Sequence, residues 1–280
     1  MKKSETIIDR DGTGRPVPLF GPEEFAAMRR AGQLAAMTLD YITPFVRPGI
    51  STGELDRLIA AFIADHGARS ATLGYRGYPK SCCISVNHVV NHGIPSDDKI
   101  LRDGDILNID VTVILDGWYG DTSRMYFAGE RIPVKARRLV EVTFEAMWAG
   151  IRAVRPGATL GDVGHAIQRV AESNRFSVVR EFVGHGIGQT FHQPPEVRHF
   201  GRPGEGLVLR PGMIFTIEPM INAGRPAVKV LADGWTAVTR DRSLSAQFEH
   251  TVGVTEEGVE VFTLSPKGLH KPPYPPTTAD

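Results

Sequence analysis

The stretch LRDGDILNID, Leu101–Asp110, returns 108 residues further along the chain as LRPGMIFTIE, Leu209–Glu218. A second stretch, VRPGISTGELDRLI at Val46–Ile59, returns at the same offset as VRPGATLGDVGHAI at Val154–Ile167. Two motifs repeated at one offset indicate an internal duplication. We therefore expect two related halves, each built in the order helix, loop, helix and strands.

A third repeat has a different spacing. VNHGI at Val90–Ile94 resembles VGHGI at Val183–Ile187, 93 residues later. Each half is thus expected to contribute one histidine-glycine loop and one strand tipped by a carboxylate, Asp110 or Glu218. A duplication that served stability alone would not place charged residues where the apolar alternation favours Val or Ile. These carboxylates therefore point to function.

The helices are predicted from capping signals and from apolar periodicity. Ser51 and Glu54 form a capping box that opens a helix. The same spacing recurs at Thr159 and Asp162 in the second half. The helical faces expected to be buried contain Met28, Ala31, Ala35, Thr38, Ile42 and Phe45; Leu55, Leu58, Ile59, Phe62 and Ile63; and Val163, Ala166, Ile167, Val170 and Ala171.

The composition argues against several classes of partner. The chain has 280 residues, of which 41% are hydrophobic and 23% are charged, enough apolar material for a buried core. Its 32 basic and 32 acidic residues balance, so we expect neither nucleic acid nor an anionic membrane as a partner. The sequence shows no signal peptide and no uncharged apolar run long enough to span a membrane, so we expect a cytoplasmic protein. The two cysteines, Cys82 and Cys83, suit a reducing compartment.

The segment ILNIDVTVILDGWYGDTSRMYFAG, Ile106–Gly129, has two strand-like runs around Asp116–Gly117, which predicts a β-hairpin. With a two-residue turn, Thr112 faces Asp121, and Asp110 becomes the diagonal neighbour of Asp121 on the same face. A three-residue turn would instead place the two aspartates on opposite faces. Two like charges held together raise each other's pKa, a conflict that a divalent cation removes.

Three further residues extend this set of potential ligands. Pro219 follows Glu218 and lacks an amide donor, so Glu218 should lie where strand pairing stops. In SAQFEHTVGVT, Ser245–Thr255, alternation places Glu249 on the polar face. His185 is expected in a loop of three glycines. Four carboxylates and one imidazole suit two divalent cations such as Mn, Fe(II) or Co, which can activate a water for hydrolysis.

The motifs NHGIP, NIDVTV, GDTSRM, GHGIGQTFHQPP, FTIEPM and SLSAQFEHT resemble those of bacterial type I methionine aminopeptidases. This resemblance runs from about Gly21 to Leu264. It implies an α+β pita-bread fold, in which two pseudo-symmetric αβ halves surround a central dinuclear metal site. It also implies an N-terminal extension over residues 1–20, one catalytic domain over 21–265 with halves of about 21–130 and 131–265, and a Pro-rich C-terminal tail over 266–280.

The resemblance assigns a role to each potential ligand. Asp110 would bind one metal, His185 and Glu218 would bind the other, and Asp121 and Glu249 would bridge both. The implied metals are Co, Mn or Fe(II), with Zn as a further candidate. The family also suggests one Na or K ion, held by the backbone carbonyls of Asn87, Val89 and Ser245.

Contacts with the substrate also follow from the resemblance. His92 and His192 would contact the substrate amide and stabilise the tetrahedral intermediate, while Glu218 would move a proton. The S1 pocket for the methionine side chain would be lined by Tyr75, Tyr78, Cys83, Phe191 and Trp235.

Some nearby residues depart from the pattern common in bacterial members. Thr72, Arg76 and Gln193–Pro194 are the departures, and they leave the fine specificity open. The other histidines match no metal-ligand position of the family, and no function is inferred for them: His66, His88, His165, His199, His250 and His270.

The activity implied is removal of the initiator methionine from nascent proteins whose second residue is small, by hydrolysis with a water activated by two divalent metals. The substrates would be N-terminal peptides, with transient contact to the ribosome, and the chain would be a monomer. Two alternatives stay open. An X-Pro aminopeptidase or prolidase shares the ligand set, although those enzymes normally carry a large N-terminal domain. A non-catalytic peptide-binding module of the same fold would be expected to lose ligands.

Overall fold

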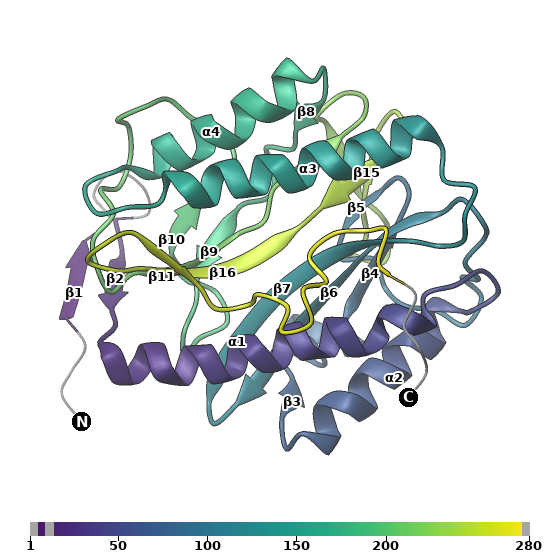
Figure 1. Ribbon diagram of the computed structural model, residues 1–280, viewed down its shortest axis with the longest axis horizontal. Helices are drawn as coiled ribbons and strands as arrows, with labels where there is room; N and C mark the ends of the chain where they lie inside the picture. Colours follow the sequence, from purple (N-terminus) through teal and green to yellow (C-terminus); the bar gives the residue numbers. More distant parts are fainter. Residues whose placement is uncertain (1–4, 9–13, 276–280) are drawn as a thin grey trace.

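The structure is a computed structural model that describes residues 5–8 and 14–275. The short strands β1 (Glu5–Ile8) and β2 (Pro16–Leu19) pair antiparallel and precede the body of the chain. The helices are α1 (Pro22–Ile42), α2 (Thr52–Asp65), α3 (Val134–Ala153) and α4 (Leu160–Ser173), with 3-10 helices at Thr43–Phe45 and Tyr75–Gly77. A pair of long helices thus precedes the strands of each half, as the sequence predicted (Figure 1).

Each half contributes strands to one central sheet, and its remaining strands belong to smaller sheets. The first half contributes β3 (Arg69–Ser70), β4 (Cys83–Val86), β5 (Val89–Asn91), β6 (Ile106–Leu115) and β7 (Trp118–Phe127). The second half contributes β8 (Ser177–Val178), β9 (Gly184–Gly186), β10 (Gln193–Val197), β11 (Ile214–Ile217), β12 (Met220–Asn222), β13 (Val228–Val230), β14 (Ala237–Thr239), β15 (Ser245–Gln247), β16 (Glu249–Val254) and β17 (Val259–Val261). The central sheet runs in the order β10-β9-β11-β16-β7-β6-β3, with β4 paired to β6 and β17 to β16, so within this sheet the halves meet where β16 pairs with β7. The remaining strands form two three-stranded sheets, in the orders β15-β12-β8 and β13-β14-β5.

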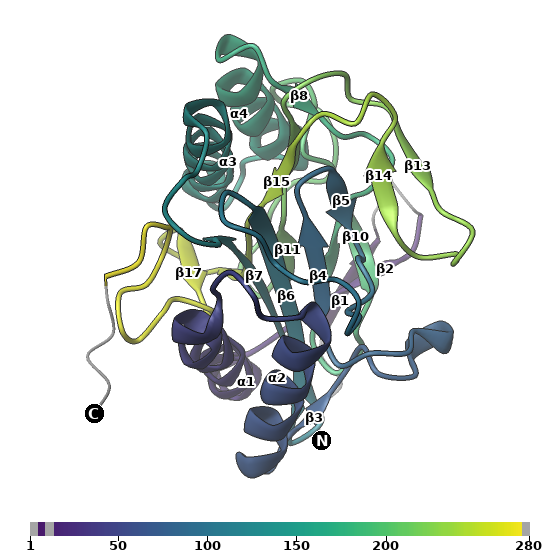
Figure 2. The ribbon, with the colours of Figure 1, turned by 90° about the vertical axis from the view of Figure 1, so that its right-hand side faces the viewer.

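The four long helices lie on one side of this sheet (Figures 1 and 2). Helix α1 packs on β6 and β7, while α3 packs on β11 and β15. Each helix pair covers its own hydrophobic core, and the larger of the two cores lies beneath α3 and α4. The expected faces are buried at Met28, Ala31, Ala35, Thr38 and Ile42 in α1, at Leu55, Ile59 and Ile63 in α2, and at Val163, Ile167 and Ala171 in α4.

The duplication is visible in the hydrogen bonding. Ser51, just before α2, forms an isolated antiparallel bridge with Ile100. Thr159, just before α4, forms the same bridge with Val208, and both partners are 108 residues further along the chain. The two halves therefore repeat in space the relationship that they repeat in sequence.

The two capping boxes form to different degrees. Thr159 Oγ1 accepts a hydrogen bond from the backbone N–H of Asp162 at 3.2 Å, and Asp162 Oδ2 accepts from the backbone N–H of Thr159 at 2.7 Å. In the first half Ser51 Oγ accepts from the backbone N–H of Glu54 at 3.0 Å, and only this half of the expected box is present. Both helices nonetheless begin directly after the predicted cap.

Close packing of α1 on β7 depends on Gly120. A Cβ atom at this position would lie 2.2 Å from the carbonyl oxygen of Ala31 in α1, which is shorter than any tolerated contact. A glycine lets the helix lie directly on the strand that also carries Asp121. The first helix is thereby fixed relative to the candidate site.

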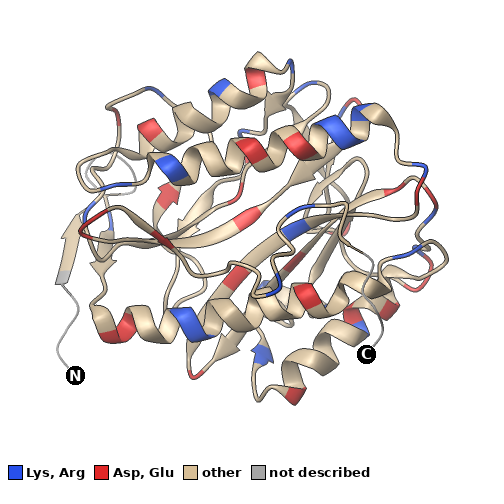
Figure 3. Cartoon of the chain, in the orientation of Figure 1, with Lys and Arg blue, Asp and Glu red and all other residues tan. Residues whose placement is uncertain are grey.

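The described part of the Pro-rich tail, residues 266–275, packs on the body. Leu269 is buried, and the hydroxyl of Tyr274 donates to the backbone carbonyl of Met125 at 2.9 Å. Basic and acidic residues occur together on α3 and on α4 and are not separated onto different elements (Figure 3). Within the described residues, no helix is both long enough and apolar enough to cross a membrane.

Candidate metal centre

The β6–β7 hairpin positions the two aspartates as the sequence predicted. Leu115 pairs with Trp118 across a two-residue turn, and Thr112 pairs with Asp121. Asp110 and Asp121 therefore project from the same face of the sheet as diagonal neighbours. Thr112 Oγ1 donates to Asp121 Oδ1 at 2.7 Å, which fixes the orientation of this carboxylate.

The second half contributes His185 and Glu218. Two local expectations were wrong, one for His185 and one for Asp110 in the first half. His185 lies in the short strand β9, paired with β10 and β11, whereas a glycine loop was expected. Its glycine neighbours allow close strand packing: a Cβ atom at Gly186 would lie 2.0 Å from the carbonyl oxygen of Pro194. Asp110 lies in the middle of the ten-residue strand β6, not at its tip, because β6 continues into the hairpin. Glu218 does follow directly after β11.

Thr216 connects His185 to Glu218. The Oγ1 atom of Thr216 accepts from the backbone N–H of His185 at 3.0 Å and donates to Glu218 Oε1 at 2.8 Å. One hydroxyl thus orients both residues. Thr216 was not identified from the sequence, although its position two residues before Glu218 on a strand places both on the same face.

Glu249 enters the site from the start of β16, where it pairs with Ser123 of β7. The expected alternation holds: Phe248 packs in the larger core and His250 hydrogen-bonds Thr263 on the other face. Gln247 lies beside the site, and its Nε2 donates to Glu218 Oε2 at 3.3 Å.

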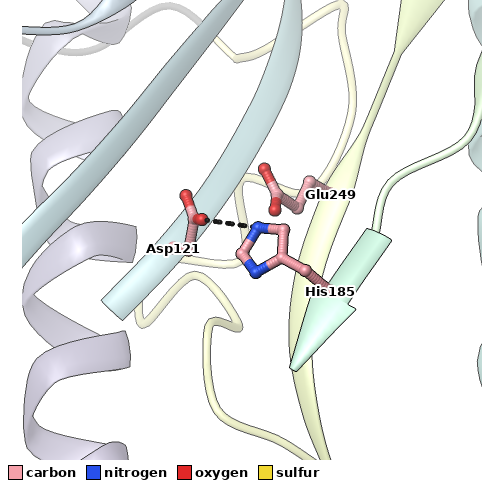
Figure 4. Close-up of side chains that lie close together, drawn as sticks. All are labelled: Asp121, His185 and Glu249. Carbon is pink, nitrogen blue, oxygen red and sulfur yellow. Dashed lines mark ion pairs between the residues drawn. The ribbon is translucent and has the colours of Figure 1, made fainter. Parts of the chain in front are cut away.

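Asp121, His185 and Glu249 form a compact group. Each offers one ligand atom, and these atoms lie within 4.8 Å of one another (Figure 4). His185 Nε2 is 3.6 Å from Asp121 Oδ2 and 3.6 Å from Glu218 Oε1. The three residues come from β7, β9 and β16, so the site lies where the two halves meet.

The electrostatics of the site fit bound cations. Burial, together with the charges of Asp121 and Glu218, raises the pKa of Asp110 well above its usual value. Burial likewise raises the pKa of Glu249 far above its usual value, and that of Glu218 to about 7. Burial lowers the pKa of His185, but hydrogen bonding and charge from Asp121 and Glu218 outweigh this and raise it. Asp110 Oδ1 is buried without a hydrogen-bond partner among the described residues, as expected of a metal-ligand oxygen.

A cavity of about 450 Å³ opens onto this cluster. Its wall includes all five candidate metal ligands and both histidines predicted to contact substrate, His92 and His192. It also includes the five residues expected in the methionine pocket: Tyr75, Tyr78, Cys83, Phe191 and Trp235. Residues chosen from both halves of the sequence are thus brought together in one cavity.

The two histidines predicted to contact the substrate, His92 and His192, are uncharged at neutral pH. Burial lowers the pKa of His92 to about 4, with Asp121 opposing the shift. Burial, with the charge of His185 and Arg76, lowers the pKa of His192 to about 3. His192 Nδ1 is 2.9 Å from the hydroxyl of Tyr75, which leaves Nε2 for the cavity.

The sequence departures also border this cavity, at Thr72, Arg76, Gln193 and Pro194. Arg76 has a left-handed backbone conformation, with φ of 47°, and its guanidinium lies 5.3 Å from the centre of the Tyr75 ring. The residues suggested for a monovalent cation lie outside the cavity. Asn87 has φ of 57°, and its carbonyl accepts from the backbone N–H of Ser245 at 2.8 Å, while Val89 begins the neighbouring strand β5.

Comparisons with known proteins show which family of proteins this chain resembles. A model of metallopeptidase family M24 matches residues 26–256. The methionine aminopeptidase of Rickettsia prowazekii is 58% identical over 259 residues, covering 92% of this chain and 99% of that protein. The methionine aminopeptidase of Escherichia coli (strain K12) is 54% identical over 244 residues, covering 87% of this chain and 92% of that protein.

Solved structures give the same result. The crystal structure of methionine aminopeptidase from Rickettsia prowazekii superposes with a TM-score of 0.87 at 57% identity, covering 89% of this chain and 100% of that one. A prolidase from Pyrococcus furiosus superposes with a TM-score of 0.69 at 21% identity, covering 88% of this chain and 65% of that one. The second likeness establishes a shared fold only.

Proposed function

The chain belongs to metallopeptidase family M24 and has the pita-bread fold, and from this premise we propose that it acts as a methionine aminopeptidase. Its substrates would be nascent proteins that begin with methionine followed by a small residue. The observation that carries this proposal is the single cavity that joins five potential metal ligands, two neutral histidines and an aromatic pocket. An X-Pro peptidase is less well supported, because the prolidase likeness stands at 21% identity against 58% for a methionine aminopeptidase.

We assign the metal ligands as part of this proposal. Asp110, Asp121, His185, Glu218 and Glu249 would together hold the divalent cations, with Asp110 on one side of the set and His185 and Glu218 on the other, as the family likeness implies. The chemistry that such ions supply when bound is a water of lowered pKa and polarisation of the scissile carbonyl. Carboxylates and one imidazole, without a sulfur ligand, suit Mn, Fe(II) or Co.

The remaining groups position the substrate and move the proton. If the Tyr75 hydroxyl donates to His192 Nδ1, the ring proton of this neutral imidazole lies on Nε2, which can donate to the substrate amide. His92 is also neutral and can donate within the same cavity. Glu218 accepts the proton of the attacking water and passes it to the leaving amide nitrogen.

The methionine side chain would lie among aromatic rings and one thiol. Tyr78 and Trp235 meet edge to face with ring centres 5.1 Å apart, and Tyr75 lies 4.8 Å from Phe191. Burial raises the pKa of the Cys83 thiol well above its usual value, so it presents a neutral sulfur. Apolar, polarisable walls of this kind suit a flexible thioether.

Other parts of the proposal rest on the family likeness. We propose a Na or K ion at the carbonyls of Asn87, Val89 and Ser245, a monomeric state, transient ribosome contact, and a cytoplasmic location where nascent chains are made. Each can be tested separately from the peptidase activity.

The test of the proposed function measures release of free methionine from Met-Gly-Met-Met and Met-Lys-Met-Met. Chelator-treated protein is assayed with and without Mn, Fe(II) or Co, and beside its Asp121→Ala and Glu249→Ala variants. We expect metal-dependent cleavage of the glycine peptide alone, and none by the variants. Folded protein that is inactive with every metal, or that cleaves only X-Pro peptides, would overturn the proposal.

A further inference from the structure

A second cavity, larger than the one that holds the candidate metal centre, lies elsewhere in the described part of the chain. It has a volume of about 770 Å³ and lies between α4 and the segment that follows β10. Its charged lining includes Arg169 of α4, Arg180 after β8, and Arg198 and Arg202 after β10. This cavity takes no part in the proposed peptidase reaction.

The positive charges in this cavity are only partly neutralised by its own carboxylates. Arg202 Nη1 is 3.7 Å from Glu205 Oε1, and this is the one ion pair that the described lining residues make. Arg180 lies with its guanidinium 4.7 Å from the centre of the Phe200 ring, an arrangement that holds the charge without neutralising it. Arg169, Arg180 and Arg198 therefore have guanidinium groups free of carboxylates within 4.0 Å among the described residues.

The acidic side chains that line the cavity have contacts of other kinds than the arginines. Glu172 accepts a hydrogen bond from Gln168 Nε2 at 2.8 Å along the same helix. Glu196 lies on β10, at the boundary with the catalytic cavity. His165 adds a further basic group from α4. The lining thus combines four arginines with the three glutamates Glu172, Glu196 and Glu205, which leaves an excess of positive charge.

The two cavities share a boundary. Glu196 lines both of them, and the consecutive residues Arg180 and Glu181 line one each. Glu196 lies on β10, which is the edge strand of the central sheet in the described residues. Because Glu196 lines both cavities, an extended peptide that leaves the catalytic cavity across this edge, advancing about 3.3 Å per residue, passes next to the arginine-lined cavity.

We propose that the arginine-lined cavity binds the part of the peptide substrate that follows the cleaved bond, and that it selects acidic side chains there. This inference rests on the proposed peptidase function and adds a substrate preference to it. Asp or Glu at about the fourth to sixth residue would meet Arg169, Arg180 or Arg198. Guanidinium groups suit carboxylates because they offer paired donors in a planar fork.

The experiment compares C-terminally amidated peptides of the form Met-Ala-Ser-Xaa-Xaa-Xaa-Ser, with Asp, Ser or Lys at the three variable positions. Amidation removes a terminal carboxylate that would compete for the arginines. At low salt we expect kcat/KM to fall in the order Asp, Ser, Lys, by about two- to fivefold per step, the range that exposed ion pairs supply. Added salt should reduce the differences.

Charge reversal distinguishes an ion-pair role from a structural one. The double variant Arg169→Glu and Arg198→Glu should invert the order, so that the Lys peptide becomes the best substrate. Arg47→Glu is the matched control, because Arg47 is exposed in the loop before α2 and lies outside this cavity. Each rate is divided by the rate of the same protein on Met-Ala-Ser, which removes general losses of activity.

Two outcomes would overturn the inference. One is an identical kcat/KM ratio across the peptides, or an equal change in the Arg47→Glu control. The other is an unchanged peptide order in the double variant; weaker binding of that variant to ribosomal RNA would then assign the cavity to phosphate groups. Cleavage of Met-Ala-Ser in the same assay shows that the proposed peptidase function stands independently.

Discussion

The buried imidazole of His199 accepts a hydrogen bond from the backbone N–H of Glu218 at 3.1 Å through its Nε2 atom. Burial lowers the pKa of His199 to about 3, so the ring is neutral and its proton lies on Nδ1. Glu218 is thereby held at both ends: His199 fixes its backbone, while Thr216 and Gln247 contact its carboxylate.

The first prediction concerns this contact. His199→Phe removes the acceptor and leaves the buried N–H of Glu218 unpaired, which costs about 1–3 kcal/mol of stability. We expect kcat to fall roughly 10- to 100-fold, as is typical when a group that orients a metal ligand is lost. His199→Gln should recover much of this, because its amide oxygen can accept the same N–H. Equal kcat and melting temperature for the two variants would show that the hydrogen bond does not matter.

The second prediction concerns the crowded carboxylates. In chelator-treated protein, Asp110→Asn removes a carboxyl group whose charged form is disfavoured by burial and by the charges of Asp121 and Glu218. We expect this metal-free variant to melt roughly 2–4 °C higher than the metal-free parent, the change that about 1 kcal/mol produces in a chain of this size. With saturating Mn the order should reverse, because only the parent keeps all ligands and gains the full stabilisation from binding.

A matched control supports that comparison. Asp98→Asn makes the same chemical change at an exposed position outside the site. Its melting temperature should follow the parent both with and without metal. If Asp110→Asn also follows the parent in the absence of metal, charge repulsion is not a feature of the empty site.

Much of this site could be predicted because it depends on local rules. The two-residue turn at Asp116–Gly117 fixed the register of β6 and β7, and that register placed Asp110 and Asp121 on one face. The offset of 108 residues predicted the equivalent helices α2 and α4, since the caps at Ser51 and Thr159 repeat with it.

Other features depend on contacts between distant segments and could not be predicted in this way. The pairing of β9 with β10 and β11 gives His185 its strand conformation, because neighbouring backbones supply the partners that a glycine-rich segment does not specify alone. His199 likewise gains its role only when the chain after β10 folds back beneath Glu218. Without the family resemblance, neither His192 nor the lining of the methionine pocket would have been distinguished from ordinary core and loop residues.

The third prediction concerns the pH dependence of stability. His92 has a pKa of about 4 in the folded protein, against about 6.5 when unfolded, because burial disfavours its charged form. The unfolded chain therefore binds more protons between these values, so this residue reduces stability as pH falls from about 6.5 towards 4, by up to about 1.4 kcal/mol per pH unit. In chelator-treated protein, His92→Gln should lose less stability between neutral and mildly acidic pH than the parent. Parallel pH profiles from denaturant unfolding would contradict this.

The last prediction concerns a buried ion pair that joins three segments. Arg124 of β7 contacts Asp40 of α1, and both side chains are 2% exposed. Arg124 Nη2 also donates to the carbonyl of Ala36 at 3.2 Å, and Ser265 Oγ donates to Asp40 Oδ1 at 2.8 Å. Arg124→Met leaves the Asp40 carboxylate buried without its cation and should lower the free energy of unfolding by about 3–5 kcal/mol.

Adding Asp40→Asn removes the unpaired buried charge while keeping an acceptor for Ser265, so the double variant should be more stable than Arg124→Met alone. Urea unfolding of the parent, both single variants and the double variant measures this coupling, and additive losses would show that the two charges do not stabilise each other.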